Sequence, residues 1–274
     1  MKSILVPTDF SSCADKAFDL ALTIAAKANL PITVLHVTES GDADENEDPK
    51  KAVAKSSLDK LEGLRQKTSE AVIIRTHTDN GNIVDAVLKG VKTFAADLII
   101  MGTQGATGFK KLAVGSKTAA VISRAPVPVL SIPAGYQQQP FKEVLLAIKN
   151  EDEDLQNLSP LFELADLFGA RVRLAIFTGE GSEAVDYVSD RRTITQIQRK
   201  LQDAYQKEGI EVEHLSGTNF EETLQAYIAE HNINLLCMIT HKRGFLGSLF
   251  NRSATQQMSY HATLPLLTLH SKHA

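Results

Sequence analysis

The second half of the chain repeats the first, and this repeat limits the possible folds more than any other feature. Lys2–Asp9 aligns with Lys142–Lys149, and Asp97–Thr103 aligns with Asn234–Thr240. From residue 97 onward the two halves stay aligned without a gap, which pairs Ser116 with Ser253, Thr118 with Thr255, Ala125 with Ala262 and Pro128 with Pro265. The sequence therefore predicts two similar domains in tandem.

Length and composition agree with two domains. The chain has 274 residues, of which 43% are hydrophobic, and this is enough apolar material for two packed cores. The segment Ala134–Pro140 is polar with turn-forming ends, which is typical of a domain boundary. We expect a first domain over residues 1–136 and a second over residues 140–274.

Apolar runs alternate with amphipathic runs through the first half. The apolar runs predict strands at 4–8, 31–37, 71–76, 97–101 and 127–132, and helical spacing predicts helices at 12–28, 50–68, 82–95 and 116–124. Ser11 or Ser12 is the expected cap of the first helix. Five short strands that alternate with helices indicate an α/β domain whose parallel sheet is covered on both faces. Ligands of such sheets bind at the carboxyl ends of the strands.

A glycine-spaced loop follows the strand expected at 97–101. Gly102 and Gly105 are separated by two residues, and nine residues lie between Gly105 and the pair Gly115-Ser116. Glycines in this position leave the backbone open to a ligand, and a helix that starts at Ser116 directs free N–H groups and a positive dipole end at the loop. Thr118 adds a second hydroxyl. This pattern favours the binding of a nucleotide's phosphates.

The spacing does not fit the two most familiar phosphate-binding motifs. The interval from Gly108 to Gly115 is wrong for a P-loop, and Ser116 stands where the P-loop lysine would follow the glycine. The dinucleotide fingerprint of Rossmann folds is absent as well. The loop resembles instead the ATP-binding signature of the universal stress protein family, Gly-x2-Gly-x9-Gly-Ser/Thr, and the whole chain resembles two such domains.

This resemblance implies tandem Rossmann-like domains of the adenine nucleotide alpha hydrolase-like type, with ATP or AMP bound, with or without Mg²⁺. By similarity, Pro7, Thr8 and Asp9 lie against the adenosine portion, and the backbone of Val37 binds the adenine edge. Met101 ends the strand before the loop. The phosphates would lie against the glycine loop and the helix start, which comprise Gly102, Gly105, Gly115, Ser116, Lys117 and Thr118.

The second half keeps the core and loses the signature. Lys149 replaces Asp9, and the positions of Gly102, Gly105 and Gly115 are occupied by Ile239, Lys242 and Arg252. Side chains of this size would fill the space that bare backbone leaves for ribose and phosphate. We therefore expect one nucleotide site per chain. The basic segment His241–Arg243 is interpreted as a solvated loop, with a bare anion as the alternative ligand.

The resemblance predicts a nucleotide-dependent regulatory module of the stress response that acts on an unidentified protein partner. The last strands, Val127–Ile132 and Leu264–Leu269, would pair within one chain as a pseudo-dimer, or between chains in a homodimer. One alternative is a slow ATPase or phosphotransferase, although no activated nucleophile or general base accompanies the glycine motif and at most weak hydrolysis is expected. The other alternative is a structural scaffold with vestigial sites.

Charge and composition exclude other classes of function. A formal charge of −4 and a pI near 6.1 argue against a general nucleic-acid or membrane-surface binder. No apolar stretch of membrane-spanning length occurs and the amino terminus lacks the pattern of a signal peptide, so we expect a cytoplasmic protein.

Cysteines, histidines and one acidic run complete the candidates. Cys13 and Cys237 are not expected to form a disulfide. Cys237 is interpreted as core, and Cys13 would suit redox sensing only if exposed. The eight histidines show no metal-ligand spacing, and His36 is expected to pack within its strand. The acidic run 42–48 is expected to be a surface loop.

Overall fold

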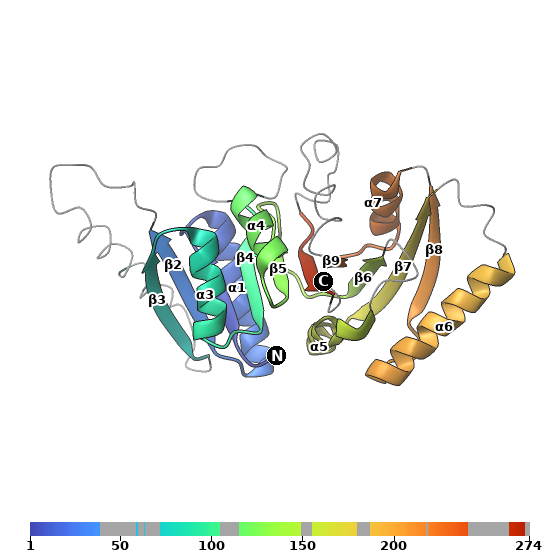
Figure 1. Cartoon of the computed structure of the whole chain (residues 1–274), viewed down its shortest axis with the longest axis horizontal. Coiled ribbons are helices and arrows are strands. Elements are labelled where there is room, and N and C mark those ends of the chain that lie inside the picture. The colour runs from blue at the N-terminus through green and yellow to red at the C-terminus, as the bar shows by residue number, and fades with distance from the viewer. Residues whose placement is uncertain are drawn as a thin grey trace. The chain divides into compact units, whose positions relative to one another are not determined.

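The structure is a computed structural model, and it describes residues 1–38, 59, 63, 72–104, 115–148, 155–179, 187–217, 219–240 and 263–271. The chain divides into two compact units, Met1–Gln138 and Gln139–Ala274. Each unit is an α/β domain with a parallel sheet, as the sequence predicted (Figure 1). The acidic run 42–48 and most of the helix expected at 50–68 lie outside the described residues.

The first domain has a five-stranded parallel sheet in the order β3-β2-β1-β4-β5. Helices α3 and α4 pack beside each other on one face of this sheet, and α1 covers the other face (Figure 1). Its elements are β1 (Ile4–Thr8), α1 (Ser12–Ala28), β2 (Ile32–Thr38), β3 (Ile74–Asn80), α3 (Ile83–Thr93), β4 (Leu98–Gly102), α4 (Ser116–Arg124) and β5 (Val129–Ile132).

The second domain repeats this topology, with its strands in the order β8-β7-β6-β9-β10. A short 3₁₀ turn, η1 (Leu155–Asn157), precedes its first α-helix. The other elements are β6 (Glu143–Ile148), α5 (Ser159–Phe168), β7 (Arg171–Gly179), α6 (Tyr187–Tyr205), β8 (Glu211–Gly217), α7 (Phe220–Glu230), β9 (Leu235–Thr240) and β10 (Leu266–His270).

Helix α1 shows why the buried elements follow the sequence pattern closely. Ser11 caps it, because its hydroxyl accepts the N–H of Ala14 at 3.2 Å. The apolar residues at helical spacing are all buried, and they are Ala14, Ala17, Phe18, Ala21, Ile24 and Ala25. The helix ends at Asn29, which adopts the left-handed conformation with φ 53°.

Two strands of the first domain differ from the prediction by more than one residue at an end. The strand expected at 71–76 runs from Ile74 to Asn80, and its side chains from Arg75 to Thr78 are exposed. It is an edge strand whose side chains can be polar as well as apolar, so an apolar run in the sequence does not identify it. The last strand begins at Val129 rather than Val127 because Pro128 has no N–H to donate to the ladder.

Candidate functional site

The site predicted from the sequence falls at the point where the strand order of the first domain reverses. From β1 the chain proceeds outward through β2 and β3, and then it returns to place β4 on the other side of β1. Asp9 directly follows β1 and Gly102 ends β4, so both lie at the carboxyl ends of two paired strands. This is where open parallel sheets bind their ligands.

The turn between β1 and α1 is held by its own side chains. The hydroxyl of Thr8 accepts the N–H of Phe10 at 3.0 Å, and a carboxylate oxygen of Asp9 accepts the N–H of Ser11 at 3.0 Å. The Ser11 hydroxyl donates to the carbonyl of Gln104, at 3.5 Å, which links this turn to the segment after β4. Asp9 is exposed, and its carboxylate therefore serves the turn while remaining accessible to a ligand.

Gly102 is constrained by helix α1, which is a second reason for a glycine beside the one expected from the sequence. A Cβ at this position would lie 2.9 Å from Cys13 Sγ and 3.0 Å from the Cys13 carbonyl carbon. A real Cβ does not approach other atoms so closely, so the glycine allows the start of α1 to pack against the end of β4. The bare backbone at Gly102 is therefore required by packing, whether or not a ligand is bound.

Gly115 closes the base of the glycine-spaced loop. Its N–H donates to the carbonyl of Thr103 at 2.6 Å, and the Thr103 N–H donates to the carbonyl of Ile132 at 2.9 Å. A Cβ on Gly115 would lie 2.9 Å from the Thr103 carbonyl oxygen. Thus Thr103 and Gly115 meet beside the end of β5. Gly105 and the rest of the loop, residues 106–114, lie outside the described residues.

Helix α4 begins immediately after Gly115, which is its N-cap. Among the described side chains none caps this helix, and its first turn contains no acidic residue. Ser116 and Lys117 are exposed there. Thr118 is buried, and its hydroxyl donates to the carbonyl of Gly102 at 3.0 Å. The hydroxyl proton of Thr118 is therefore used within the fold, and Ser116 is the accessible hydroxyl of this turn.

The remaining predicted residues can offer a ligand mainly their backbone. The side chains of Pro7 and Met101 are buried within β1 and β4. Val37 is half-buried near the end of β2. The structure thus brings the ends of three neighbouring strands and the start of α4 to one edge of the sheet, with backbone groups and the exposed side chains of Asp9, Ser116 and Lys117.

Sequence analysis missed two residues of this site. Phe10 is in the left-handed conformation with φ 60°, and its ring lies 4.6 Å from that of His36, centroid to centroid. His36, expected to be simply packed, is half-buried, and its Nδ1 lies 2.9 Å from the carbonyl oxygen of Thr8. A histidine that precedes the end of a strand was the only available signal.

The cysteines and the metal candidates give clear results. Neither Cys13 nor Cys237 is in a disulfide and both are buried, and Cys13 Sγ donates to the carbonyl of Ile132 at 3.2 Å. The exposure on which redox sensing depended is therefore absent for Cys13. Within the described part of the chain, no group of three or more His, Cys, Asp or Glu side chains could hold a metal ion. In the same residues, no helix has the length and apolar character to cross a membrane.

Comparisons with known proteins agree with the fold and the repeat. The sequence model of the universal stress protein family matches residues 1–133 and again residues 140–270. This chain therefore belongs to the universal stress protein family, as a tandem two-domain member.

Relatives of this family resemble either one domain or the whole chain. A universal stress protein of Methanocaldococcus jannaschii is 27% identical over 142 residues, which is 48% of this chain and 81% of the relative. One from Bacillus subtilis is 26% identical over 143 residues, 47% of this chain and 97% of the relative. A crystal structure of a universal stress protein from Archaeoglobus fulgidus covers 98% of both chains, with a TM-score of 0.75 and 20% identity.

Proposed function

We propose that the first domain binds ATP or AMP at the carboxyl ends of β1, β2 and β4, and that occupancy regulates a partner protein in a stress response. Membership of the universal stress protein family supports the general role. The intact glycine spacing from Gly102 to Ser116 supports a nucleotide as the ligand. A regulatory ligand of this kind would act by favouring one conformation or one partner over another.

The start of α4 is the observation that carries this proposal. In the first domain, α1 is capped by Ser11 and α3 by Asn82, whose side chain accepts two backbone N–H groups. Helix α4 has Gly115 instead, no side-chain cap among the described residues and no acid in its first turn. Its first N–H groups and its positive dipole end, with exposed Lys117 beside them, form a good environment for a phosphate.

Asp9 and the strand ends would bind the other part of the nucleotide. Asp9 is exposed beside the reversal point of the strand order, and a carboxylate is a suitable acceptor for ribose hydroxyl groups. Val37 lies one strand further along, and its backbone would contact the edge of the base. Adenosine and phosphate would then occupy neighbouring parts of the same sheet edge.

Calorimetric titration of the full-length chain with ATP and AMP, each with and without Mg²⁺, tests this proposal. We expect saturation near one nucleotide per chain, since Ile239 and the other replacements remove the signature from the second domain. A stoichiometry near two would contradict the assignment to the first domain alone. The absence of binding under all four conditions would favour a scaffold with vestigial sites.

Substitution of Gly115 tests whether the phosphate lies at the start of α4. Gly115→Arg copies the residue of the second domain, and we expect it to abolish binding because the side chain would stand between the start of α4 and the phosphate. Gly115→Ala is the matched control for the close contact of the added Cβ with the Thr103 carbonyl oxygen, 2.9 Å away, which both variants share. Wild-type affinity in the arginine variant would overturn the placement of the phosphate.

A further inference from the structure

Phe10 has a backbone conformation that requires an explanation. Residues with side chains rarely adopt positive φ, and those that do are most often Asn or Asp. Phe10 has φ 60° in the turn between β1 and α1, directly after Asp9. Such conformations persist where the surrounding structure holds them in place, and they are frequent at functional sites.

Two of the contacts of Phe10 hold it in this conformation. One is with Thr8, and the other is with His36, which itself contacts Thr8. The N–H of Phe10 donates to the Thr8 hydroxyl at 3.0 Å, and the Phe10 ring lies against the ring of His36 on the neighbouring strand. A carbonyl oxygen can only accept a hydrogen bond, so the His36 Nδ1, 2.9 Å from the Thr8 carbonyl, carries the proton and donates it. His36 therefore contacts the turn at both of its sides, at the Thr8 carbonyl and at the Phe10 ring.

We propose that His36 and Phe10 are positioning residues that fix the direction of the Asp9 carboxylate before a ligand binds. Asp9 is the middle residue of the Thr8–Phe10 turn, and its own side chain accepts the Ser11 N–H at 3.0 Å. With Thr8 and Phe10 held, the backbone of Asp9 has little freedom. The consequence for affinity rests on the proposed function, because it requires that Asp9 contacts the nucleotide.

The second domain has lost these residues together. In strand register Thr8 lies opposite His36, and in the second domain Ile148 lies opposite Ile176, so Ile176 takes the place of His36. Ile176 has no donor for a carbonyl. The position of Phe10 is Asn150, a residue that tolerates positive φ without a supporting ring, and that of Asp9 is Lys149. The residues that position the carboxylate are thus present in the first domain, which has Asp9, and absent from the sequence of the second, which has Lys149.

Two variants of His36 separate its two contacts. His36→Phe keeps a ring beside Phe10 and removes the donor to Thr8, whereas His36→Asn places a donor near the position of Nδ1 and removes the ring. His77→Phe is the matched control, because His77 is exposed on the adjacent strand β3 and its ring contacts Phe94 instead of the turn.

The first measurement needs no ligand. Amide hydrogen exchange by NMR reports the turn directly, through the N–H groups of Phe10 and Ser11 that donate to Thr8 and Asp9. We expect faster exchange of both amides in His36→Phe and unchanged exchange in His77→Phe, with His36→Asn between them. Unchanged exchange in a folded His36→Phe would overturn the positioning role, and it would do so even if the protein bound no nucleotide.

The second measurement is a double-mutant cycle on ATP affinity. The dissociation constant should rise about fivefold in His36→Phe, the size expected for one lost positioning hydrogen bond. In an Asp9→Ala background the same substitution should have no effect, because His36 acts through Asp9. An equal loss in both backgrounds would show that His36 acts on the ligand or the fold instead. Failure of the wild-type chain to bind ATP or AMP would refute only the proposed function.

Discussion

The two domains share their backbone plan but stabilise the amino-terminal edge of the sheet in different ways. One feature is common: Asp97 accepts the N–H groups of Lys2 and Ser3, and Asn234, at the aligned position, accepts those of Lys142 and Glu143. The same kind of side chain therefore ties the start of the central strand in both domains. The other side-chain contacts at this edge differ between the two domains.

The first domain brings helix and sheet into close contact there. Gly90 of α3 faces the sheet, and a Cβ on it would lie 3.2 Å from a methyl carbon of Leu35 and 3.4 Å from one of Leu5. Thr33 lies opposite Leu5 in the strand register and is fully buried on the side of the sheet that α3 covers. Small residues thus allow α3 to pack directly on the sheet.

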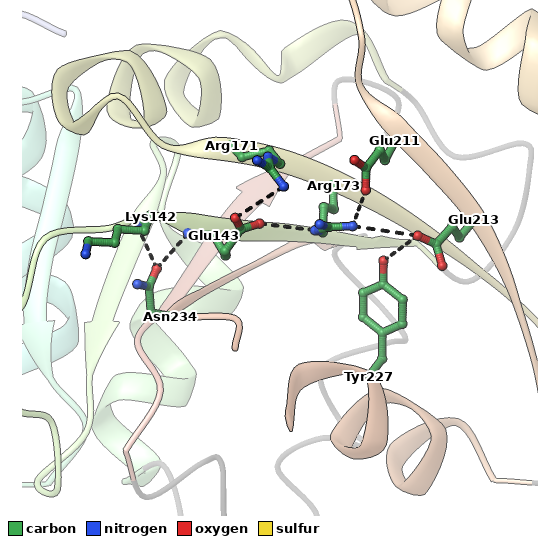
Figure 2. A network of polar contacts seen from close by, with 8 residues as sticks. All are labelled: Lys142, Glu143, Arg171, Arg173, Glu211, Glu213, Tyr227 and Asn234. Carbon is green, nitrogen blue, oxygen red and sulfur yellow. Dashed lines mark hydrogen bonds and ion pairs between the residues drawn. The ribbon is translucent and has the colours of Figure 1, made fainter. Parts of the chain in front are cut away.

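The second domain has a charged network at the same place, shown in Figure 2. Tyr227 occupies in α7 the position of Gly90 in α3, and Arg173 occupies in β7 the position of Thr33. Arg173 forms ion pairs with Glu143 at 3.1 Å, with Glu213 at 3.8 Å and with Glu211, while the Tyr227 hydroxyl donates to Glu213 at 3.1 Å. The larger residues are accommodated because each polar group has a partner.

The carboxyl-terminal edge shows the opposite asymmetry. Gly102 admits the start of α1, which begins at Ser12, whereas Ile239 stands at the same position of β9 and is buried. Helix α5 begins only at Ser159, which aligns with Asp19 rather than Ser12. Gly102 thus accompanies an early start of the first helix of its domain, and Ile239 accompanies a later one. The comparison therefore links one glycine to the shape of the candidate site.

Removal of Arg173 should have the largest effect on this comparison. Arg173→Met keeps most of the side-chain volume but removes the positive charge that pairs with Glu143, Glu211 and Glu213, whose carboxylates lie close together. The Arg173 side chain is only 11% exposed. We expect a loss of up to about 3 kcal/mol of local stability, the lower limit for a broken buried ion pair, because Glu211 and Glu213 are 49% and 42% exposed and water screens their charges. Hydrogen exchange of peptides from β6, β7 and β8 measures this loss, and peptides from β1 and β2 provide an internal reference.

Arg171→Met is the matched control for that experiment. Arg171 is 59% exposed and has a 3.7 Å contact with Glu143, and exposed pairs of this kind contribute about 0–1 kcal/mol. Equal effects of the two arginine variants would mean that burial of Arg173 has no importance for the second domain.

Gly102→Ala should have the next largest effect, at the other edge of the first domain. The added Cβ would overlap Cys13, so we expect a loss of about 1–3 kcal/mol, typical of overpacked cores, and greater exchange of the first turns of α1. Gly63→Ala adds a Cβ with no described atom within 4 Å and is the control. If Gly102→Ala unfolds at the same denaturant concentration as wild type, the link between this glycine and α1 is wrong.

The sequence predicted the fold of both domains and their buried strands, because these depend on local patterns, while the site at the strand ends stays a prediction. Strand β1 is buried at every residue, and its apolar run is sufficient to identify it. The partner of Gly102 and the conformation of Phe10 depend on contacts between elements far apart in the chain, so no local spacing reveals them.

The network around Arg173 was equally beyond local patterns. It joins three strands and a helix, and each charged residue by itself looks like an ordinary surface residue. The internal repeat did contain a signal, since Ser3 aligns with Glu143 and Gly90 with Tyr227, which marks a place where the two cores cannot be packed alike.

Tyr227 provides the smallest and most specific test. Burial, and then the negative charge of Glu213, raise the pKa of Tyr227 to about 12, from 10.0 in the unfolded chain. The folded state holds this proton more tightly, so its contribution to stability is complete below pH 10 and is lost as the pH rises toward 12. Between pH 9 and 11 the free energy of unfolding should fall by about 1 kcal/mol more in wild type than in Tyr227→Phe.

Denaturant unfolding of the two proteins at a series of pH values measures this difference, and exchange of peptides from α7 and β8 assigns it to the second domain. The first domain has Gly90 at this position and no hydroxyl to ionise, so its own peptides should respond equally in both proteins. Parallel pH profiles for wild type and Tyr227→Phe would show that the Tyr227 hydroxyl is not held by Glu213 in solution. The charged network would then stabilise the second domain only through the ion pairs of Arg173.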